Sequence, residues 1–223
     1  MTFNAMDYVE TILTDDSFAS KYKAEENSLG HDGAERLGQL RNMVKSMLDF
    51  AAKAQIQFER NVDHLANAKL TSSDSSSPYY YNPSDVTAST IGNTCASDMK
   101  TGLSDLGLSY KGTSILYLSG TSLRHYFKIE DEEKFNKIKT VKFNNKTVSY
   151  STKGEEIYFE LTDIHAADLD KLMALSFGKT EYAFSVLDYV KACLESTKVS
   201  DSTKALVKAT YCYNKDAKTY FDR

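Results

Sequence analysis

The chain has 223 residues, of which 41% are hydrophobic and 26% are charged, and its formal net charge is −4. These values are typical of a globular protein, and a chain of this length can bury a sizeable core without disulfide or metal support. Lysine and arginine are dispersed among aspartate and glutamate, whereas a protein that binds nucleic acid usually carries a basic stripe. We therefore expect no nucleic-acid partner.

The three cysteines, Cys95, Cys193 and Cys212, form no CxxC pair. They predict free thiols rather than a disulfide framework or a zinc site, and we expect no other cofactor. A membrane-spanning helix needs about 18 or more consecutive apolar residues. The sequence has no such stretch and shows no secretory signal at its N-terminus. The G-x-S-x-G, P-loop, Rossmann and H-E-x-x-H motifs are also missing, so we expect a non-catalytic protein.

The N-terminal part of the chain predicts a helical hairpin. Residues 3–13, FNAMDYVETIL, begin with Asn4, a favourable N-cap, and carry Asp7 where an acid complements the free amides of a first turn. Apolar residues then recur at steps of three and four between Leu37 and Phe58. That spacing is the pattern of an amphipathic helix.

Between these two helices, the segment LGHDGAERLG places His31 and Asp32 between Gly30 and Gly33. A metal-binding or catalytic loop is one interpretation. Two ligands do not make a metal site, however, and glycine-rich polar segments are usually plain loops. We therefore expect a loop.

A segment rich in serine and proline follows and predicts a linker. It contains Tyr79, Tyr80 and Tyr81, whose flat rings are candidates for stacking on sugars. Adjacent residues of an extended chain point to opposite sides, so three in a row do not make one platform. Packing of one or two of these rings onto a β-sandwich is the simpler interpretation.

From residue 85 the period of the apolar residues changes to two, which predicts β-strands. Asn144-Asn145 and Gly178-Lys179 predict tight turns, because asparagine and glycine tolerate a left-handed backbone. The predicted strands, roughly seven in number, are 106–110, 114–118, 123–129, 141–143, 148–150, 157–161 and 172–177. Their spacing is typical of an antiparallel, immunoglobulin-like sandwich.

The strand at 123–129 holds the most informative side chains. His125 shares the apolar face with Leu123 and Phe127, and it is a candidate ligand or acid–base group. A core histidine that is hydrogen-bonded to a neighbour is the commoner interpretation of such a residue. Arg124 and Tyr126 alternate with His125, so they lie on the opposite face as candidates for binding a ligand.

Three acids in the segment LTDIHAADLDKL, Asp163, Asp168 and Asp170, are candidates for calcium ligands. Their spacing fits no EF-hand loop, which also needs a glycine and a closing glutamate. We expect a turn or a one-turn helix that joins two strands.

The C-terminal part repeats the N-terminal helices. Residues 184–194, FSVLDYVKACL, match residues 3–13 at five of eleven positions, and residues 204–223 align with residues 41–60. The first copy carries 18 more residues between its two helices, around Lys21–Arg36. A motif that recurs after a sandwich-sized interval is typical of a tandem array. We expect one whole unit, preceded by the helical hairpin of another unit whose sandwich is missing.

Three segments carry a resemblance to a family: VKSMLDFAAKAQIQFERNVDHLAN, GTSLRHYFKI and LVKATYCYNKDAKTYF. Each resembles a stretch of large, little-characterised surface or secreted proteins of gut Firmicutes. The resemblance covers nearly the whole chain and is weakest in the linker. It implies an extracellular or cell-surface location, and it implies no activity.

The sequence thus predicts an α+β fold, in which helical hairpins precede and follow an antiparallel, immunoglobulin-like sandwich. The predicted domains are a helical hairpin at 1–70, a Ser/Pro/Tyr linker at 71–84, the sandwich at 85–183 and a second helical hairpin at 184–223.

We expect a structural or adhesive module of a larger bacterial surface or secreted protein. Its partners would be neighbouring modules of the same protein, glycans, or surface proteins of a host or bacterium. The alternative is a carbohydrate-binding module that uses exposed tyrosines of the sandwich. An exposed, coplanar pair of aromatic rings would favour that alternative.

Overall fold

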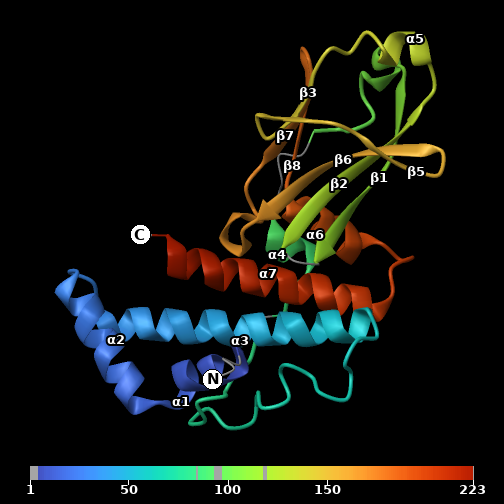
Figure 1. Ribbon diagram of the computed structural model, residues 1–223. Helices are drawn as coiled ribbons and strands as arrows, with labels where there is room; N and C mark the ends of the chain where they lie inside the picture. The colour runs from blue at the N-terminus through green and yellow to red at the C-terminus, as the bar shows by residue number, and fades with distance from the viewer. Residues whose placement is uncertain (1–4, 84, 93–96, 118–119, 223) are drawn as a thin grey trace. The chain divides into compact units, whose positions relative to one another are not determined.

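The computed structural model describes residues 5–83, 85–92, 97–117 and 120–222 (Figure 1). The chain forms two compact units: a helical unit of Met1–Val86 with Lys198–Arg223, and a sheet unit of Thr87–Thr197. In sequence, the sheet unit is an insertion into the helical unit. The fold is α+β with antiparallel strands, as predicted, and the described strands form two sheets of four strands each rather than about seven strands in all. The finer assignment, an immunoglobulin-like sandwich, stays a prediction.

The helical unit contains four helices in its described part. They are α1 (Ala5–Thr14), α2 (Asp16–Ser28), α3 (Gly33–Gln57) and α7 (Asp201–Phe221). The apolar stripe predicted from Leu37 onwards lies on α3, which ends at Gln57, whereas Phe58 is its exposed C-cap. The extra residues of the first repeat form the second half of α2, a short turn and the start of α3.

The core of the helical unit joins α1 to α3. Its buried residues are Val9, Ile12, Leu13, Leu40, Val44 and Leu48. The approach of α2 to α3 requires a glycine, because a Cβ atom at Gly33 would lie 2.3 Å from the backbone oxygen of Lys23. Asp32 caps α3 by accepting hydrogen bonds from the backbone amides of Ala34 and Glu35.

Helix α7 packs along α3 in the antiparallel direction (Figure 1). The Thr203 hydroxyl at the start of α7 donates to Gln57 at the end of α3, over 3.0 Å. Phe50 and Tyr213 stack near the middle, with ring centroids 5.7 Å apart. Because this apolar contact holds α7 on α3, the predicted domains 1–70 and 184–223 do not coincide with the compact units.

The predicted linker is irregular but belongs to the helical unit. It folds back on itself, since the Thr71 amide donates to the Tyr79 carbonyl and the Tyr81 amide donates to the Thr71 carbonyl. It is therefore an ordered connection rather than a plain spacer.

The sheet unit consists of short strands with a few small helices. Its strands are β1 (Leu108–Tyr117), β2 (Thr121–Ile129), β3 (Val141–Phe143), β4 (Lys146–Val148), β5 (Ser151–Lys153), β6 (Glu156–Ile164), β7 (Met173–Phe177) and β8 (Thr180–Phe184). Its helices are α4 (Ala88–Ile91), α5 (Glu132–Phe135), α6 (Val186–Glu195) and the 3-10 turns η1 (Leu103–Leu106) and η2 (Ala166–Asp168).

The strands form two sheets with the orders β1-β2-β6-β5 and β4-β3-β7-β8. Both sheets contribute to one core, in which Phe127 and Phe159 of the first meet Phe143 and Phe177 of the second. The rings of Phe127 and Phe177 pack edge to face, with centroids 5.7 Å apart. The alternating apolar residues of the sequence are thus the inward faces of two facing sheets.

The predicted turns follow the sequence, whereas the bounds of the first strand differ. Asn144 and Asn145 have φ angles of 49° and 67° in the β3–β4 turn, and Gly178 has a φ of 68° in the β7–β8 turn, so both predicted turns are confirmed. The strands predicted at 106–110 and 114–118 are instead one strand, β1, with an irregularity between Tyr110 and Gly112. Leu118 lies outside the described residues.

Candidate functional site

The outer face of the β1-β2-β6-β5 sheet carries the main candidate site. Arg124 and Tyr126 lie on it, because Leu123, His125 and Phe127 of the same strand are buried. The β2–β6 register places Tyr126 beside Tyr158 and Arg124 beside Glu160. We call these four residues the outer-face cluster.

The opposite charges of the outer-face cluster pair with each other within the sheet. The Arg124 guanidinium donates to the Glu160 carboxylate over 3.1 Å, and it lies 4.5 Å from the centroid of the Tyr158 ring. Burial lowers the pKa of Arg124, but the bonds to Glu160 and Tyr126 outweigh that effect and raise it overall. Arg124 thus acts as a fixed cation between an acid and an aromatic ring.

The aromatic rings of the cluster are adjacent but not coplanar. The centroids of Tyr126 and Tyr158 are 5.4 Å apart, and their planes are inclined by 45°. The Lys153 ammonium lies 5.4 Å from the centroid of the Tyr126 ring. Both tyrosines are half-buried. This arrangement offers aromatic edges and charged groups to a ligand, rather than a flat platform.

The three consecutive tyrosines do not form a platform. The Tyr79 hydroxyl donates to the Glu10 carboxylate of α1. Burial raises the pKa of Tyr81, which lies near Cys212 of α7. These contacts place Tyr79 and Tyr81 on helices, whereas we predicted packing on a sandwich, because the segment that carries them is part of the helical unit. The five predicted site residues are therefore divided between the two units.

His125 is a core residue, so the structural interpretation is confirmed. Its side chain is fully buried, and Nδ1 lies 2.7 Å from the Thr113 hydroxyl. The imidazole packs between the rings of Phe143 and Phe184, with centroids 5.3 and 5.2 Å away. Burial lowers its pKa to about 3, so His125 is neutral at physiological pH and inaccessible to a substrate.

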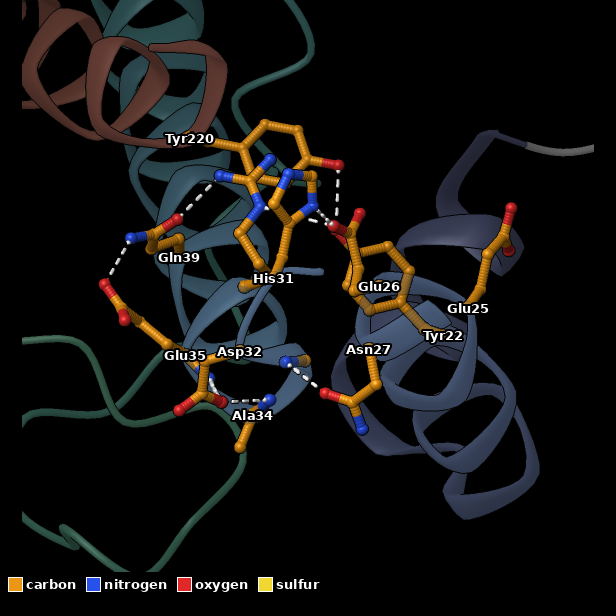
Figure 2. Close-up of polar contacts among 12 residues, drawn as sticks. Tyr22, Glu25, Glu26, Asn27, His31, Asp32, Ala34, Glu35, Gln39 and Tyr220 are labelled. Carbon is orange, nitrogen blue, oxygen red and sulfur yellow. Dashed lines mark hydrogen bonds and ion pairs between the residues drawn. The ribbon is translucent and has the colours of Figure 1, made fainter. Parts of the chain in front are cut away.

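His31 belongs to a polar cluster in the helical unit that the sequence did not predict (Figure 2). Its Nδ1 lies 2.6 Å from the Glu26 carboxylate, and Arg36 Nε lies 3.6 Å from the same oxygen. The Arg36 guanidinium also lies 4.5 Å from the centroid of the Tyr220 ring. We call these four residues the Glu26 cluster; it ties α2, α3 and the end of α7 together.

Within the Glu26 cluster, the carboxylate is held in its ionised form. The hydrogen bond from His31 is the largest cause, and together with Tyr22 and the charge of Arg36 it lowers the pKa of Glu26 despite burial. Burial and the bond to Tyr220 raise the pKa of Tyr22. The pairing of His31 with Glu26 resembles the arrangement in which a carboxylate orients a histidine. The further contacts of Glu26 with Arg36, and of Arg36 with Tyr220, are those of an ion pair with a structural role.

Two of the three candidate acids, Asp163 at the end of β6 and Asp168 of η2, line a small polar pocket of about 190 Å³. Asp168 is paired with Lys171 over 2.7 Å, and η2 is the predicted one-turn helix. Asp163 has a φ of 60°, and its carboxylate accepts from Thr162. Among the described residues, no group of three or more His, Cys, Asp and Glu side chains could hold a metal ion.

The two described cysteines, Cys193 and Cys212, are free thiols, as predicted. Burial raises the pKa of both, that of Cys212 to about 11. Neither is therefore an activated nucleophile. Cys95 lies outside the described residues. None of the helices in the described part of the chain is long and apolar enough to cross a membrane.

Sequence reasoning missed Tyr158 and Glu160 of the outer-face cluster. They alternate with the apolar Phe159 and Leu161, so their outward orientation was recognisable from the period of two. Their position beside Tyr126 and Arg124 depends on the register between β2 and β6, which no local pattern specifies.

Comparison with known proteins finds no matching family model and no significantly similar curated protein or solved structure. The function must therefore be argued from the geometry and from the internal repeat.

Proposed function

We propose that this chain is a non-catalytic structural or adhesive module of a larger bacterial cell-surface or secreted protein, in which consecutive repeats join through their long helices. The observation that carries the proposal is the pairing of α3 with α7. These helices are equivalent in the internal repeat, and they pack against each other. In repeat proteins, contacts between neighbouring repeats contribute to stability together with the intrinsic stability of each repeat.

The α3–α7 pair is nearly symmetric. Phe50 and Tyr213 are equivalent positions of the repeat, and their rings stack on each other with planes inclined by 25°. Val44 and Val207 are equivalent as well, and they are 3% and 1% exposed. An antiparallel pair in which equivalent residues meet has a local two-fold axis, as in an isologous dimer interface. One helical surface can thus join two repeats as a pair.

The surface location can be tested on the bacterium that produces the protein. Antibodies raised against the 223-residue chain should label intact cells or detect the chain in the medium. A cytoplasmic protein should serve as the control and be labelled only after lysis. If this chain too were detected only after lysis, the proposed location would be wrong.

The alternative function is binding of a carbohydrate at the outer-face cluster. The half-exposed rings of Tyr126 and Tyr158, flanked by Arg124 and Glu160, favour it, because protein sites for polar ligands combine apolar faces with a few placed polar groups. The inclination of the two rings by 45° disfavours a flat stacking platform. The structural proposal therefore has the stronger support.

A glycan array separates the two functions. If the alternative holds, the full chain should bind a defined glycan, and Tyr158→Ala should abolish binding. Tyr150→Ala is the matched control, because Tyr150 is 47% exposed in the same unit but lies outside the outer-face cluster. Absence of binding to any glycan would exclude the alternative, while equal loss in both variants would indicate a folding defect.

A further inference from the structure

A cleft of about 560 Å³ lies at one end of the sheet unit, beside α5 (Figure 1). Its walls come from three segments: η1, the chain that connects α5 to β3, and the turn between β7 and β8. A volume of about 300–1,000 Å³ is usual for a small-molecule site. The cleft shares no residue with the outer-face cluster.

The apolar side chains of the cleft belong to the core of the sheet unit or pack on it. Phe177 is a core residue and is 3% exposed, and Leu106 and Ile138 are half-buried against the same core. The cleft therefore presents apolar side chains that the surrounding core holds in place. An apolar group that enters such a cleft leaves water, which favours binding.

Hydrogen bonds hold two of the three segments together. The carbonyl of Gly107, directly after η1, accepts from the amides of Glu130 and Asp131, over 2.8 and 3.2 Å. The Lys134 ammonium of α5 donates to the carbonyl of Ser104 in η1, over 3.3 Å. Because η1 is fixed to the start of α5 in this way, this part of the cleft is preformed, as most small-molecule sites are.

The charged residues that line the cleft are mainly basic. They are three lysines, Lys134, Lys137 and Lys139, and one acid, Asp105. Lys134 lies 3.7 Å from the carboxylate of Asp131, whereas Lys137 and Lys139 are exposed and form no ion pair with any residue that the structure describes. Lysine side chains are cationic at neutral pH, so the cleft is complementary to a ligand that carries a negative group.

We propose that this cleft binds an apolar carboxylic acid of the fatty-acid type, with its hydrocarbon chain against Leu106, Ile138 and Phe177 and its carboxylate beside Lys137 and Lys139. The ligand is amphiphilic because apolar and cationic side chains line the same cleft. A protein interface usually involves about 20–30 residues on each side, whereas nine residues line the cleft, which favours a small molecule. This binding site goes beyond the proposed structural or adhesive function and does not depend on it.

Dodecanoate, kept below its micelle concentration, is the probe that tests the proposal. Isothermal titration calorimetry of the full chain should show saturable binding of one molecule. The affinity should fall by up to roughly fourfold for each methylene group that is missing in decanoate and octanoate. Dodecyltrimethylammonium has the same hydrocarbon chain and the opposite charge, so it should not bind. Absence of saturable dodecanoate binding, or equal binding of the two dodecyl compounds, would overturn the proposal.

Substitution of two lysines tests the position of the carboxylate. Lys137→Gln combined with Lys139→Gln should weaken dodecanoate binding roughly tenfold, because two partly solvated charge pairs are lost. Lys142→Gln combined with Lys146→Gln is the matched control, since these exposed lysines of β3 and β4 lie outside the cleft. The control should bind like the native protein, and both double variants should keep its melting temperature. Equal affinities of the two double variants would place the ligand elsewhere and contradict the proposal.

Vesicles of phosphatidylglycerol distinguish a free acid from a lipid surface. The native chain should stay in the supernatant when such vesicles are sedimented. Sedimentation with the vesicles that is lost in the Lys137→Gln, Lys139→Gln variant would overturn the proposal, because the lysines would then contact a membrane. None of these results bears on the surface location, which the labelling of intact cells tests separately.

Discussion

At the scale of single residues, His125 shows how burial decides the role of a titratable group. The unfolded chain binds a proton to this imidazole near pH 6.5, whereas the folded protein does so only near pH 3. Between these values the unfolded state carries more protons, so stability falls as the pH is lowered through this window. Above the window the contribution of His125 to the pH dependence vanishes.

We therefore expect His125→Phe to flatten the pH dependence of stability. Urea unfolding of the native protein should show an extra loss of up to about 1.4 kcal/mol per pH unit below pH 6.5, and the variant should lack it. His165→Gln is the control, because His165 is exposed in the same unit. Parallel curves for the native protein and His125→Phe would contradict the prediction.

The Glu26 cluster leads to a second prediction at this scale. Glu26→Gln leaves the buried Arg36 without its counterion, so the melting temperature at neutral pH should fall by several degrees. Because the folded-state pKa of Glu26 is lowered, the difference should shrink as the pH falls below its ordinary value of 4.5.

Glu25→Gln is the matched control for this prediction, since Glu25 is exposed on the same helix and points away from the cluster (Figure 2). Its melting temperature should equal that of the native protein. A similar loss in both variants would show that the effect reflects net charge rather than the ion pair.

At the scale of elements, the near-symmetric pairing of α3 with α7 predicts that Phe50 and Tyr213 are coupled. A double-mutant cycle of Phe50→Ala and Tyr213→Ala should give a coupling energy of roughly 0.5–1.5 kcal/mol, as for other packed aromatic pairs. The exchanged variant, Phe50→Tyr with Tyr213→Phe, should keep most of the stability, because the two positions are equivalent. Additive effects in the cycle would argue against a direct contact.

At the scale of the whole molecule, the sheet unit lies between α3 and α7 in the sequence. The packing of α7 therefore depends on α3, a helix far away in the chain. A fragment of residues 71–223 lacks α3 and exposes Val207, which is 1% exposed in the full chain. Because α7 resembles α3, two fragments should pair through α7, and sedimentation analysis should show a dimer. Val207→Asp should return the fragment to a monomer. A monomeric fragment without this substitution would contradict the prediction.

The sequence by itself determined the elements and several turns. The apolar period between Leu37 and Phe58 identified α3, and the period of two at 123–129 identified β2. Asn144-Asn145 identified the β3–β4 turn, since asparagine tolerates the positive φ angles observed there. These features depend on residues near each other in the chain. The spacing of apolar side chains and the backbone preference of individual residues therefore predict them directly.

Only the tertiary structure decided which elements meet. It placed Tyr158 beside Tyr126, brought Tyr220 to Arg36, and paired α7 with α3. A period of apolar residues shows that a face is buried but not which surface buries it, because many partners satisfy the same hydrophobic requirement. Equivalent sequences at α1 and α6 therefore have different surroundings, and that difference is visible only in the folded chain.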